Sequence, residues 1–252
     1  MNLKDKIVLV TGASSGIGQG IAICCAKQGA NVLITYRNNE AGARATLEEI
    51  QTYSSGQIFR ADLTRQEDRD RLFQDIKEKV GGIDALVNNA GQYKSGDVLD
   101  DDIWKDQMKN ILFAAVHTTQ KFLKQNESAD LRKIVNITSI WGKLHPGNDR
   151  CIAYAAAKAA LASMTVSLAH RDPKVQVNAV APGYTESAAW ETASEDYKKT
   201  RAEKTIIKRF VTPEEIGKMV VALLENDAMT GQVITVDGGF SLYPHPADEV
   251  KR

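Results

Sequence analysis

A tyrosine and a lysine separated by three alanines are the residues of this sequence whose types and spacing best suit chemistry. They are Tyr154 and Lys158. On a helix, residues four positions apart lie on one face, about one turn from each other. An ammonium near a phenol favours the phenolate, so Lys158 is expected to lower the pKa of Tyr154 from its usual value of about 10. Such a phenol can give or take a proton at a carbonyl, although the same spacing also occurs in exposed helix pairs.

A glycine-rich turn near the start of the chain points to a nucleotide. Residues 6–11 form an apolar run that predicts a strand, and residues 20–28 predict a helix. Strand, glycine turn and helix in this order are the context of a dinucleotide-binding fingerprint. Gly12 permits the tight turn, Gly16 lets backbone N–H groups approach a pyrophosphate, and Gly18 lets the helix pack closely on the strand. The N-terminus of the helix then faces the anion.

The end of the second predicted strand, residues 31–37, bears on the choice of cofactor. In dinucleotide-binding proteins an acidic residue there bonds the ribose 2′-hydroxyl of NAD. This sequence has Arg37, and no Asp or Glu follows before Glu40. An arginine can form two hydrogen bonds with a 2′-phosphate, which predicts NADP(H), with NAD(H) as the alternative. The other interpretation of Arg37 is a solvated loop residue.

Predicted strands and helices alternate along the whole chain. Apolar runs predict strands over residues 6–11, 31–37, 57–63, 83–87, 133–139, 175–181 and 232–237. Helical patterns cover residues 20–28, 41–53, 65–80 and 101–125, the segment from Tyr154 and the segment from Pro213. This alternation predicts an α/β fold: one Rossmann-type domain over residues 1–252, with a doubly wound parallel sheet of about seven strands and helices on both faces.

The last third of the chain contains a long stretch without a clear pattern, residues 184–211. A connection of that length is more often a functional lid than filler, so we expect a substrate lid there. Thr212 and Glu215 form a capping-box pattern with Pro213 at the first helical position, which predicts the start of a helix. Residues 244–252 are expected to form a frayed polar tail.

Composition and charge exclude several classes of protein. Of the 252 residues, 43% are hydrophobic and 25% charged, and the formal net charge is zero. No general field therefore attracts nucleic acid or an anionic membrane. The polar start is unlike a signal peptide, and no apolar run approaches the length of a membrane span. Cys24, Cys25 and Cys151 are too few and too poorly spaced for a zinc site or a disulfide framework, so we expect buried thiols, no bound metal and a cytoplasmic location.

Polar residues follow several predicted strands and are expected to meet at one edge of the sheet, because ligands of open α/β sheets bind outside the carboxyl ends of the strands. Ser139 follows its strand directly, 15 residues before Tyr154. A serine hydroxyl beside the phenol can bond the same substrate oxygen. Asn110 lies in the middle of a predicted helix, where asparagine is disfavoured, so it needs a partner or a role.

With these motifs the sequence resembles the short-chain dehydrogenase/reductase family, in particular its 3-oxoacyl-ACP reductase-like and glucose dehydrogenase-like members. The resemblance extends from Lys6 to about Gly239 and includes the glycine turn, Asn-Asn-Ala-Gly at residues 88–91 and the Tyr-x-x-x-Lys pair. It implies a Rossmann fold and an oxidoreductase that transfers a hydride between NADP(H) and a carbonyl or secondary alcohol. A small-molecule substrate and a homodimer or homotetramer are also implied.

The resemblance further implies a role for each matching residue. Tyr154 is the implied general acid/base, and Lys158 lowers its pKa and holds the nicotinamide ribose. Ser139 positions the substrate oxygen, and Asn110 anchors a water chain from Lys158; these four are the implied catalytic residues. Asp62 is expected to contact the adenine. The implied cofactor-binding residues are Gly12, Ser14, Ser15, Gly16, Ile17, Gly18, Arg37, Asp62, Leu63, Asn89, Ala90, Gly91, Tyr154, Lys158, Pro182, Gly183 and Thr185.

Some positions depart from the family pattern. Many NADP-dependent members carry Arg or Lys where this chain has Ser15, so the NADP(H) prediction rests on Arg37. An NAD-linked sugar or polyol dehydrogenase and a non-catalytic nicotinamide nucleotide sensor are therefore kept as alternatives. The complete set of catalytic residues argues against the sensor, because a sensor needs no proton relay. The residues suggested as walls of the substrate pocket are Trp141, His145, Tyr184 and Trp190, and the loop between Ser139 and Tyr154 also contains Pro146.

Overall fold

A single parallel sheet organises the chain in the computed structural model, which describes residues 1–125, 131–142, 149–187, 190 and 193–242. Its seven strands lie in the order β3-β2-β1-β4-β5-β6-β7, and every neighbouring pair is parallel. The predicted doubly wound sheet is therefore confirmed. The strands are β1 (Ile7–Val10), β2 (Asn31–Tyr36), β3 (Gly56–Arg60), β4 (Ala85–Asn88), β5 (Arg132–Ile137), β6 (Val175–Pro182) and β7 (Val233–Val236).

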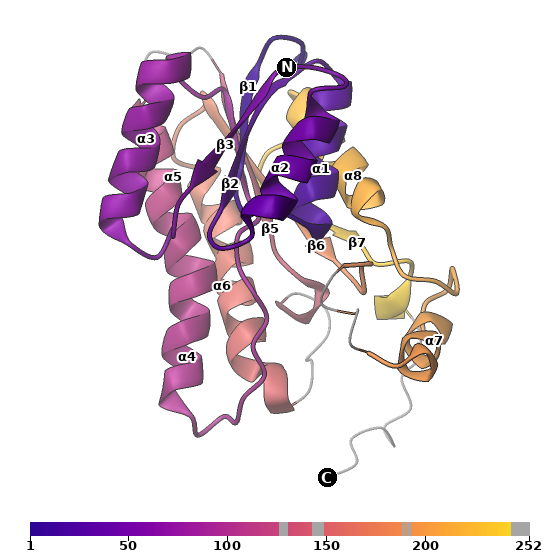
Figure 1. Ribbon diagram of the computed structural model, residues 1–252. Helices are drawn as coiled ribbons and strands as arrows, with labels where there is room; N and C mark the ends of the chain where they lie inside the picture. Colours follow the sequence, from indigo (N-terminus) through magenta and orange to yellow (C-terminus); the bar gives the residue numbers. More distant parts are fainter. Residues whose placement is uncertain (126–130, 143–148, 188–189, 191–192, 243–252) are drawn as a thin grey trace.

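Helices cover both faces of the sheet (Figure 1). The helices α1, α2 and α8 lie on one face, and α3, α5 and α6 lie on the other. Helix α4 and the segment after it continue into α5. The helices are α1 (Gly16–Lys27), α2 (Glu40–Ile50), α3 (Gln66–Val80), α4 (Asp101–Gln107), α5 (Ala114–Gln125), α6 (Ile152–Leu168), α7 (Glu195–Glu203) and α8 (Pro213–Glu225).

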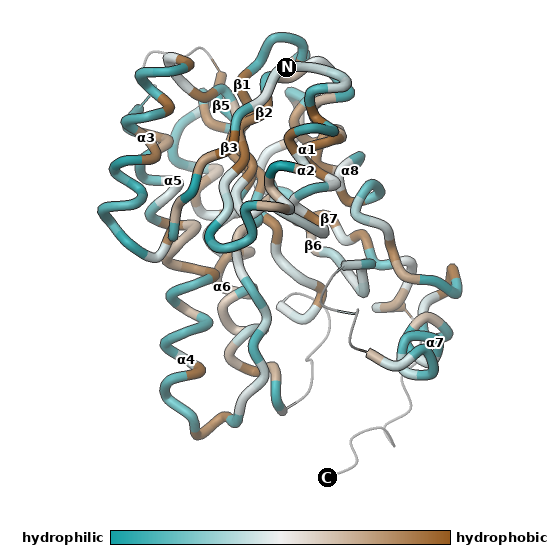
Figure 2. The backbone as a smooth tube through the Cα atoms, in the orientation of Figure 1, coloured by the Kyte–Doolittle hydropathy of each residue, from teal (hydrophilic) through white to brown (hydrophobic). Residues whose placement is uncertain are grey.

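The pleat of the strands divides the core between these two helical layers. Successive side chains of a strand point to opposite faces. In β1, Val8 and Val10 therefore pack under α1 and α8, whereas Leu9 packs under α3 and α5. Figure 2 shows mainly apolar residues along the central strands and many hydrophilic residues along the surrounding helices. Among the described residues, no helix is both long and apolar enough to cross a membrane.

The predicted helix over residues 101–125 is not regular. Residues Met108–Phe113 form a π-helical segment, η1, between α4 and α5. A π-helical turn bonds each N–H to the carbonyl five residues back, and such segments often occur at functional sites. Asn110 lies within this segment. The predicted helix over residues 101–125 is therefore present, but it changes to π-helical geometry at the asparagine that was unusual for a helix.

The stretch that was expected to be irregular, residues 184–211, contains the helix α7 and is closed at its base. Thr185 and Val211 form an isolated parallel bridge. The Val211 N–H donates to the Tyr184 carbonyl over 2.9 Å, and the Glu186 N–H donates to the Val211 carbonyl over 2.9 Å. The predicted capping box follows directly, because Thr212 and Glu215 bond reciprocally at the start of α8.

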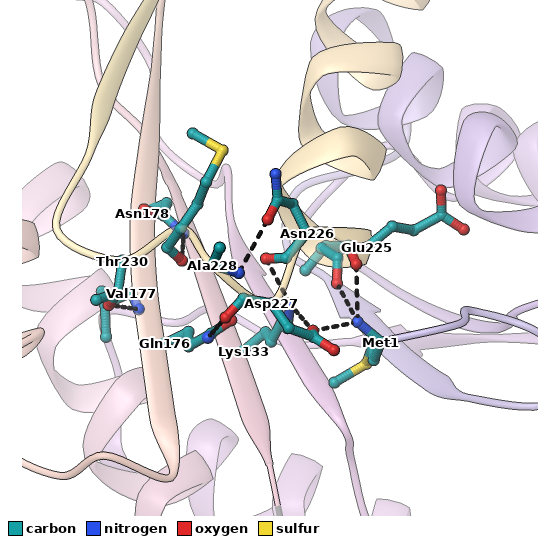
Figure 3. A network of polar contacts seen from close by, with 12 residues as sticks. Met1, Lys133, Gln176, Val177, Asn178, Glu225, Asn226, Asp227, Ala228 and Thr230 are labelled. Atoms are coloured by element: carbon teal, nitrogen blue, oxygen red, sulfur yellow. Dashed lines mark hydrogen bonds and ion pairs between the residues drawn. The ribbon is translucent and has the colours of Figure 1, made fainter.

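A polar network lies at the start of β5, opposite the carboxyl ends of the strands where the predicted site residues lie. Figure 3 shows this network. The buried Lys133 of β5 places its Nζ 2.6 Å from Asp227 Oδ1 and 3.0 Å from the Asn226 carbonyl. The amino group of Met1 also contacts Asp227 and lies 3.0 Å from the Glu225 carbonyl. These contacts hold the loop after α8 against the central strands.

Candidate active site

The side chains of Ser139, Tyr154 and Lys158 come together beside the carboxyl end of β5. Ser139 follows β5 and is buried, and Tyr154 lies in the first turn of α6. The two side chains form a hydrogen bond. Lys158 lies one turn further along α6, with its Nζ 5.8 Å from the centroid of the Tyr154 ring. The serine, the phenol and the ammonium predicted to act together are therefore neighbours.

Burial controls the ionisation of both titratable groups. It lowers the pKa of Lys158 to about 8. It also raises the pKa of Tyr154 to about 12, although the hydrogen bond with Ser139 acts in the opposite direction. The prediction that Lys158 lowers the Tyr154 pKa is therefore wrong for the chain alone. The reason is that the cost of placing a phenolate in a poorly solvated position exceeds the stabilisation by its neighbours.

A backbone carbonyl and a glycine position Lys158. Its Nζ donates to the Ile137 carbonyl over 2.6 Å, which ties α6 to the last residue of β5. A Cβ at Gly142 would lie 2.5 Å from the Ala159 nitrogen and 2.7 Å from the Lys158 carbonyl carbon. Only a glycine therefore lets the short helical turn Ile140–Gly142 pack this closely on α6.

The glycines of the turn after β1 allow the neighbouring backbone to pack closely against this turn. Gly12 has a φ of 64° and Gly16 a φ of 57°, both in the left-handed region that favours glycine. A Cβ at Gly12 would lie 2.9 Å from the Ala90 Cα, and one at Gly18 would lie 2.5 Å from the Asn89 Nδ2. The turn after β1 thus packs directly on the turn after β4.

Asn89 holds these two turns together. Its Nδ2 donates to the carbonyls of Thr11 and Gly12 over 2.9 and 3.0 Å. The Thr11 Oγ1 in turn accepts from the N–H groups of Asn89 and Ala90, each over 3.0 Å. β1 lies between β2 and β4, so the chain order reverses here, and this is where open α/β sheets bind ligands. The bare glycine backbone and the N-terminus of α1 at Gly16 fit a pyrophosphate group.

The remaining residues predicted for the cofactor line the same edge of the sheet. Asp62 accepts hydrogen bonds from the Thr64 N–H and Oγ1 over 3.0 and 2.7 Å. Burial would raise the Asp62 pKa, but these bonds and the charges of Arg37 and Lys109 lower it. Ser14 and Ser15 lie in the turn after β1, Ile17 lies in the first turn of α1, and Leu63 lies after β3. Gly91 lies after β4, and Pro182, Gly183 and Thr185 lie at the end of β6 or just beyond.

Arg37 and Asn110 contact each other, which was not predicted. The Arg37 Nη1 donates to the Asn110 Oδ1 over 3.3 Å. The Asn110 Nδ2 donates to the carbonyl and to the Oδ1 of Asp106, each over 2.9 Å. The Asn110 side chain is thus engaged on both sides, and its role as the anchor of a water chain from Lys158 stays a prediction.

Comparison with known proteins gives the family. A family model described as enoyl-(acyl carrier protein) reductase matches residues 12–241. A 3-oxoacyl-[acyl-carrier-protein] reductase of Aquifex aeolicus is 35% identical over 95% of this chain and 98% of its own. The chain belongs to the short-chain dehydrogenase/reductase family.

Other members of the short-chain dehydrogenase/reductase family show how varied its substrates are. A 3beta-hydroxysteroid dehydrogenase of Mediterraneibacter gnavus is 31% identical, over 95% of this chain and 96% of its own. The solved structure of an actinorhodin polyketide ketoreductase variant with NADPH is 31% identical, with a TM-score of 0.85 and coverage of 95% of this chain and 98% of that one. The present chain is an oxidoreductase of this family and acts on CH–OH or C=O groups.

Aromatic rings surround Tyr154 in this short-chain dehydrogenase/reductase. Trp141 lies with its ring centroid 6.1 Å from that of Tyr154, and Tyr184 and Trp190 pack in the same aromatic cluster. Their role as walls of the substrate pocket stays a prediction. His145 and Pro146 lie outside the described residues. Tyr93 was missed, although its ring centroid is 5.4 Å from that of Tyr154. Its signal was an aromatic residue two positions after the Asn-Asn-Ala-Gly turn.

Proposed function

We propose that this protein transfers a hydride between NADP(H) and a carbonyl or secondary-alcohol substrate, with Tyr154 as the general acid/base. The observation that carries the proposal is the cluster of Ser139, Tyr154 and Lys158 at the sheet edge that also holds the glycine turn. When bound, the nicotinamide supplies or accepts the hydride. In the reducing direction the Tyr154 hydroxyl gives its proton to the substrate oxygen, while the Ser139 hydroxyl orients that oxygen.

Lys158 has two tasks in this proposal. Its side chain is anchored at the Ile137 carbonyl, which leaves the remaining N–H groups for the nicotinamide ribose and for the relay to Asn110. Burial lowers its pKa to about 8, so it can exchange a proton near neutrality. A proton taken from Tyr154 during reduction is then replaced through the lysine rather than directly from bulk water.

NADP(H) is proposed as the preferred cofactor, with NAD(H) as the alternative. The NADP(H) assignment is supported by Arg37, which is exposed and follows β2 directly. It lies close enough to Asp62 for its charge to lower the Asp62 pKa. The family relative solved with NADPH is consistent with this choice. The remaining predicted residues, Ser14 to Gly18, Asp62, Leu63, Asn89 to Gly91 and Pro182 to Thr185, are proposed to complete the cofactor site.

A cofactor-oxidation assay over several carbonyl classes tests the proposed function. The protein, mixed with NADPH or NADH, is given ketones, ketoacyl thioesters, sugars and enones, and loss of the reduced nicotinamide is followed. We expect turnover of at least one C=O class, faster with NADPH, and little turnover after Ser139→Ala or Tyr154→Phe. Cofactor binding without turnover of any class would support the sensor alternative. Reduction of sugars with NADH but not with NADPH, or reduction of added NAD+ by sugars or polyols, would support the dehydrogenase alternative.

We also propose that the protein acts in the cytoplasm as a homodimer or homotetramer. Two large apolar side chains on the neighbouring segments η1 and α6 are exposed: Phe113 by 48% and Val166 by 43%. Burial of such side chains between subunits would remove apolar surface from water. Light scattering of the purified protein gives the mass, and a monomer at micromolar concentration would contradict the proposal.

A further inference from the structure

Three aromatic rings form a closed triangle at the catalytic position. The Tyr93, Trp141 and Tyr154 centroids are separated by 5.4 Å (Tyr93–Tyr154), 6.1 Å (Trp141–Tyr154) and 6.1 Å (Tyr93–Trp141). The interplanar angles are 89°, 85° and 70° in the same order, so each contact is edge-to-face. A substrate whose oxygen reaches the Tyr154 hydroxyl therefore places its neighbouring carbon atoms against Tyr93 and Trp141.

Buried hydrogen bonds hold Tyr93 in this place. The side chain of Gln107, which is fully buried, accepts from the Lys94 N–H over 3.3 Å and donates to the Gln92 carbonyl over 3.2 Å. The backbone on both sides of Tyr93 is thus fixed by one side chain from α4. The Tyr93 ring itself remains 44% exposed. A fixed, exposed aromatic ring beside the reactive group offers apolar surface that a ligand can cover.

Trp141 is fixed to the catalytic serine and extends the aromatic surface. Its backbone N–H donates to the Ser139 Oγ over 3.3 Å. On its far side its ring centroid lies 6.1 Å from that of the buried Tyr184. Tyr184 in turn contacts Trp190 and Phe210, with centroids 5.4 and 5.6 Å away. A packed aromatic cluster therefore extends from Tyr154 into the segment between Thr185 and Val211.

We propose that the substrate is a ketone or secondary alcohol carried on a flat apolar skeleton of fused rings. This proposal rests on the function proposed above and specifies its substrate class. Flat apolar rings gain from edge-to-face and offset contacts with aromatic side chains. The charged side chain beside the Tyr154 ring is Lys158, whose Nζ is tied to the Ile137 carbonyl. The side chains of Ser139, Cys151 and Tyr93, which act on the Tyr154 hydroxyl, carry no fixed charge. A sugar or a charged acyl chain would lose more hydration at such a surface than it would regain.

The experiment compares ketones of different shape in the wild-type protein. The probes are 1-tetralone and a steroid ketone for fused rings, acetoin for a small acyclic ketone, an acetoacetyl thioester, and a ketose. We expect kcat/KM for at least one fused-ring ketone to exceed that for the others by tenfold or more. Equal or better turnover of acetoin, the thioester or the ketose would overturn the substrate class while leaving the proposed function intact.

Two variants and a matched control locate the effect. Tyr93→Leu and Trp141→Leu remove one ring each. The control Tyr53→Leu removes a tyrosine remote from the site whose exposed fraction, 50%, is close to the 44% of Tyr93. Each ring removed should lower kcat/KM for the fused-ring ketone by about three- to tenfold, mainly through KM, and change the acetoin value less than twofold. The Tyr53→Leu variant should match the wild type. Equal losses for both ketones would contradict the proposal.

A binding measurement separates the proposed substrate class from the proposed hydride-transfer function. In the Tyr154→Phe variant with NADPH, quenching of tryptophan fluorescence reports binding of the fused-ring ketone without turnover. Binding that weakens after the additional Tyr93→Leu change would support the substrate class even if no ketone were reduced. Absence of both binding and preferential turnover of fused-ring ketones would overturn it, whatever other carbonyl is reduced.

Discussion

The guanidinium of Arg37, at the end of β2, donates a hydrogen bond to the side-chain oxygen of Asn110 in the π-helical segment, over 3.3 Å. These two residues were expected to serve the cofactor in different ways, one at the 2′-phosphate and the other in a water chain. Because one guanidinium nitrogen is engaged by Asn110, the contact with a 2′-phosphate must use the other donors of Arg37 or break this bond. In the proposed cofactor site, recognition of a 2′-phosphate by Arg37 would therefore depend on the state of Asn110.

Replacing Arg37 by Ala should weaken NADPH binding by about tenfold while changing NADH binding little. A charge-assisted hydrogen bond is typically worth about 1.5–3 kcal/mol, which is roughly ten- to a hundredfold in affinity. Solvent and salt screen the charge of the exposed Arg37, and its bond to Asn110 competes for the guanidinium, so we expect an effect near the lower end of this affinity range. Fluorescence titration of both cofactors measures the effect. Arg171→Ala, which removes an exposed arginine after α6, controls for general loss of charge. Equal weakening of both cofactors would show that Arg37 does not recognise the phosphate.

Replacing Tyr154 by Phe should reduce turnover by roughly 10²–10⁴-fold, since general acid/base catalysis contributes that much. The change removes the transferable proton and keeps most of the ring volume. NADPH binding should be unchanged within about twofold, which a fluorescence titration measures alongside steady-state rates. Tyr53→Phe, at an exposed tyrosine, is the control. Near-normal turnover of Tyr154→Phe would exclude the proposed mechanism.

The buried Lys158 should make stability depend on alkaline pH. Its pKa is about 8 in the folded chain, against about 10.4 when unfolded. Between these values the unfolded chain binds more protons, so the wild type gains stability as pH rises from about 8 to about 10, on the order of 3 kcal/mol. Lys158→Met lacks this dependence, and the lost bond to the Ile137 carbonyl costs it about 1 kcal/mol at every pH.

Urea unfolding of the wild type and Lys158→Met at several pH values measures this prediction. The free energy of unfolding of the variant, relative to that of the wild type, should be highest at pH 7 and lowest near pH 10. Turnover of the variant should be lost throughout, because the relay and the ribose contact are gone. A stability difference that does not change with pH would mean that Lys158 is solvated in the folded protein.

Asp227 should contribute stability that is lost in acid. Its hydrogen bond with Lys133, its bond with the Met1 amino group and the charges of both lower its pKa to about 2. Since the folded pKa lies below the unfolded value of about 3.9, the contribution is present above pH 4 and disappears as pH falls towards 2. Asp227→Asn should therefore be less stable than the wild type at pH 7, by on the order of 1 kcal/mol because the carboxylate is largely exposed.

Denaturant unfolding of Asp227→Asn and the wild type from pH 7 to pH 2 checks this. The two stabilities should converge as pH falls through 4 to 2. Activity per folded molecule should not change, because Lys133 lies at the start of β5, whereas Ser139 follows the end of that strand. A constant difference down to pH 2 would mean that the ion pair with Lys133 does not form.

Gly142→Ala should disturb the active site through packing. Its added Cβ would lie 2.5 Å from the Ala159 nitrogen, so α6 must shift next to Lys158. Gly20→Ala is a matched control, because its Cβ would lie 2.5 Å from the Pro213 carbonyl carbon, on the other face of the sheet. Both should lose about 1–3 kcal/mol of stability, as overpacking does. Only Gly142→Ala should also lose kcat per folded molecule, measured with thermal melts and steady-state rates. Equal kcat in the two variants would argue against a positioning role.

Local patterns were sufficient to predict the sheet and the residues at its edge. Apolar runs followed by polar turns gave each strand, and a parallel sheet brings the carboxyl ends of its strands to one side. Ser139, Tyr154 and Lys158 were therefore expected together from the sequence. The helix after Asp101 was harder, because the apolar spacing of Met108, Ile111 and Leu112 does not distinguish an α-helix from a π-helical turn.

Properties that depend on depth in the folded chain were not predictable from spacing. The Tyr154 pKa follows from how far the ring is removed from water, and four residues of sequence do not contain that information. The bond between Arg37 and Asn110 joins residues 73 positions apart. Tyr93 is a single aromatic residue after a turn, and one residue gives no periodic signal. Its place beside Tyr154 depends on Gln107, which also looked like an ordinary polar helix residue.

The bridge between Thr185 and Val211 makes the segment between them an exchangeable unit. Its two ends are paired to each other, and its later part is fixed separately, because the Ile206 and Ile207 N–H groups donate to the Gly238 carbonyl over 2.9 and 3.2 Å. Trp190 and Phe210 face Tyr184 from within this unit, whereas Ser139, Tyr154 and Lys158 lie outside it. Recombination between relatives with crossovers at residues 185 and 211 would thus change the substrate surface in one step and leave the proton-transfer residues untouched.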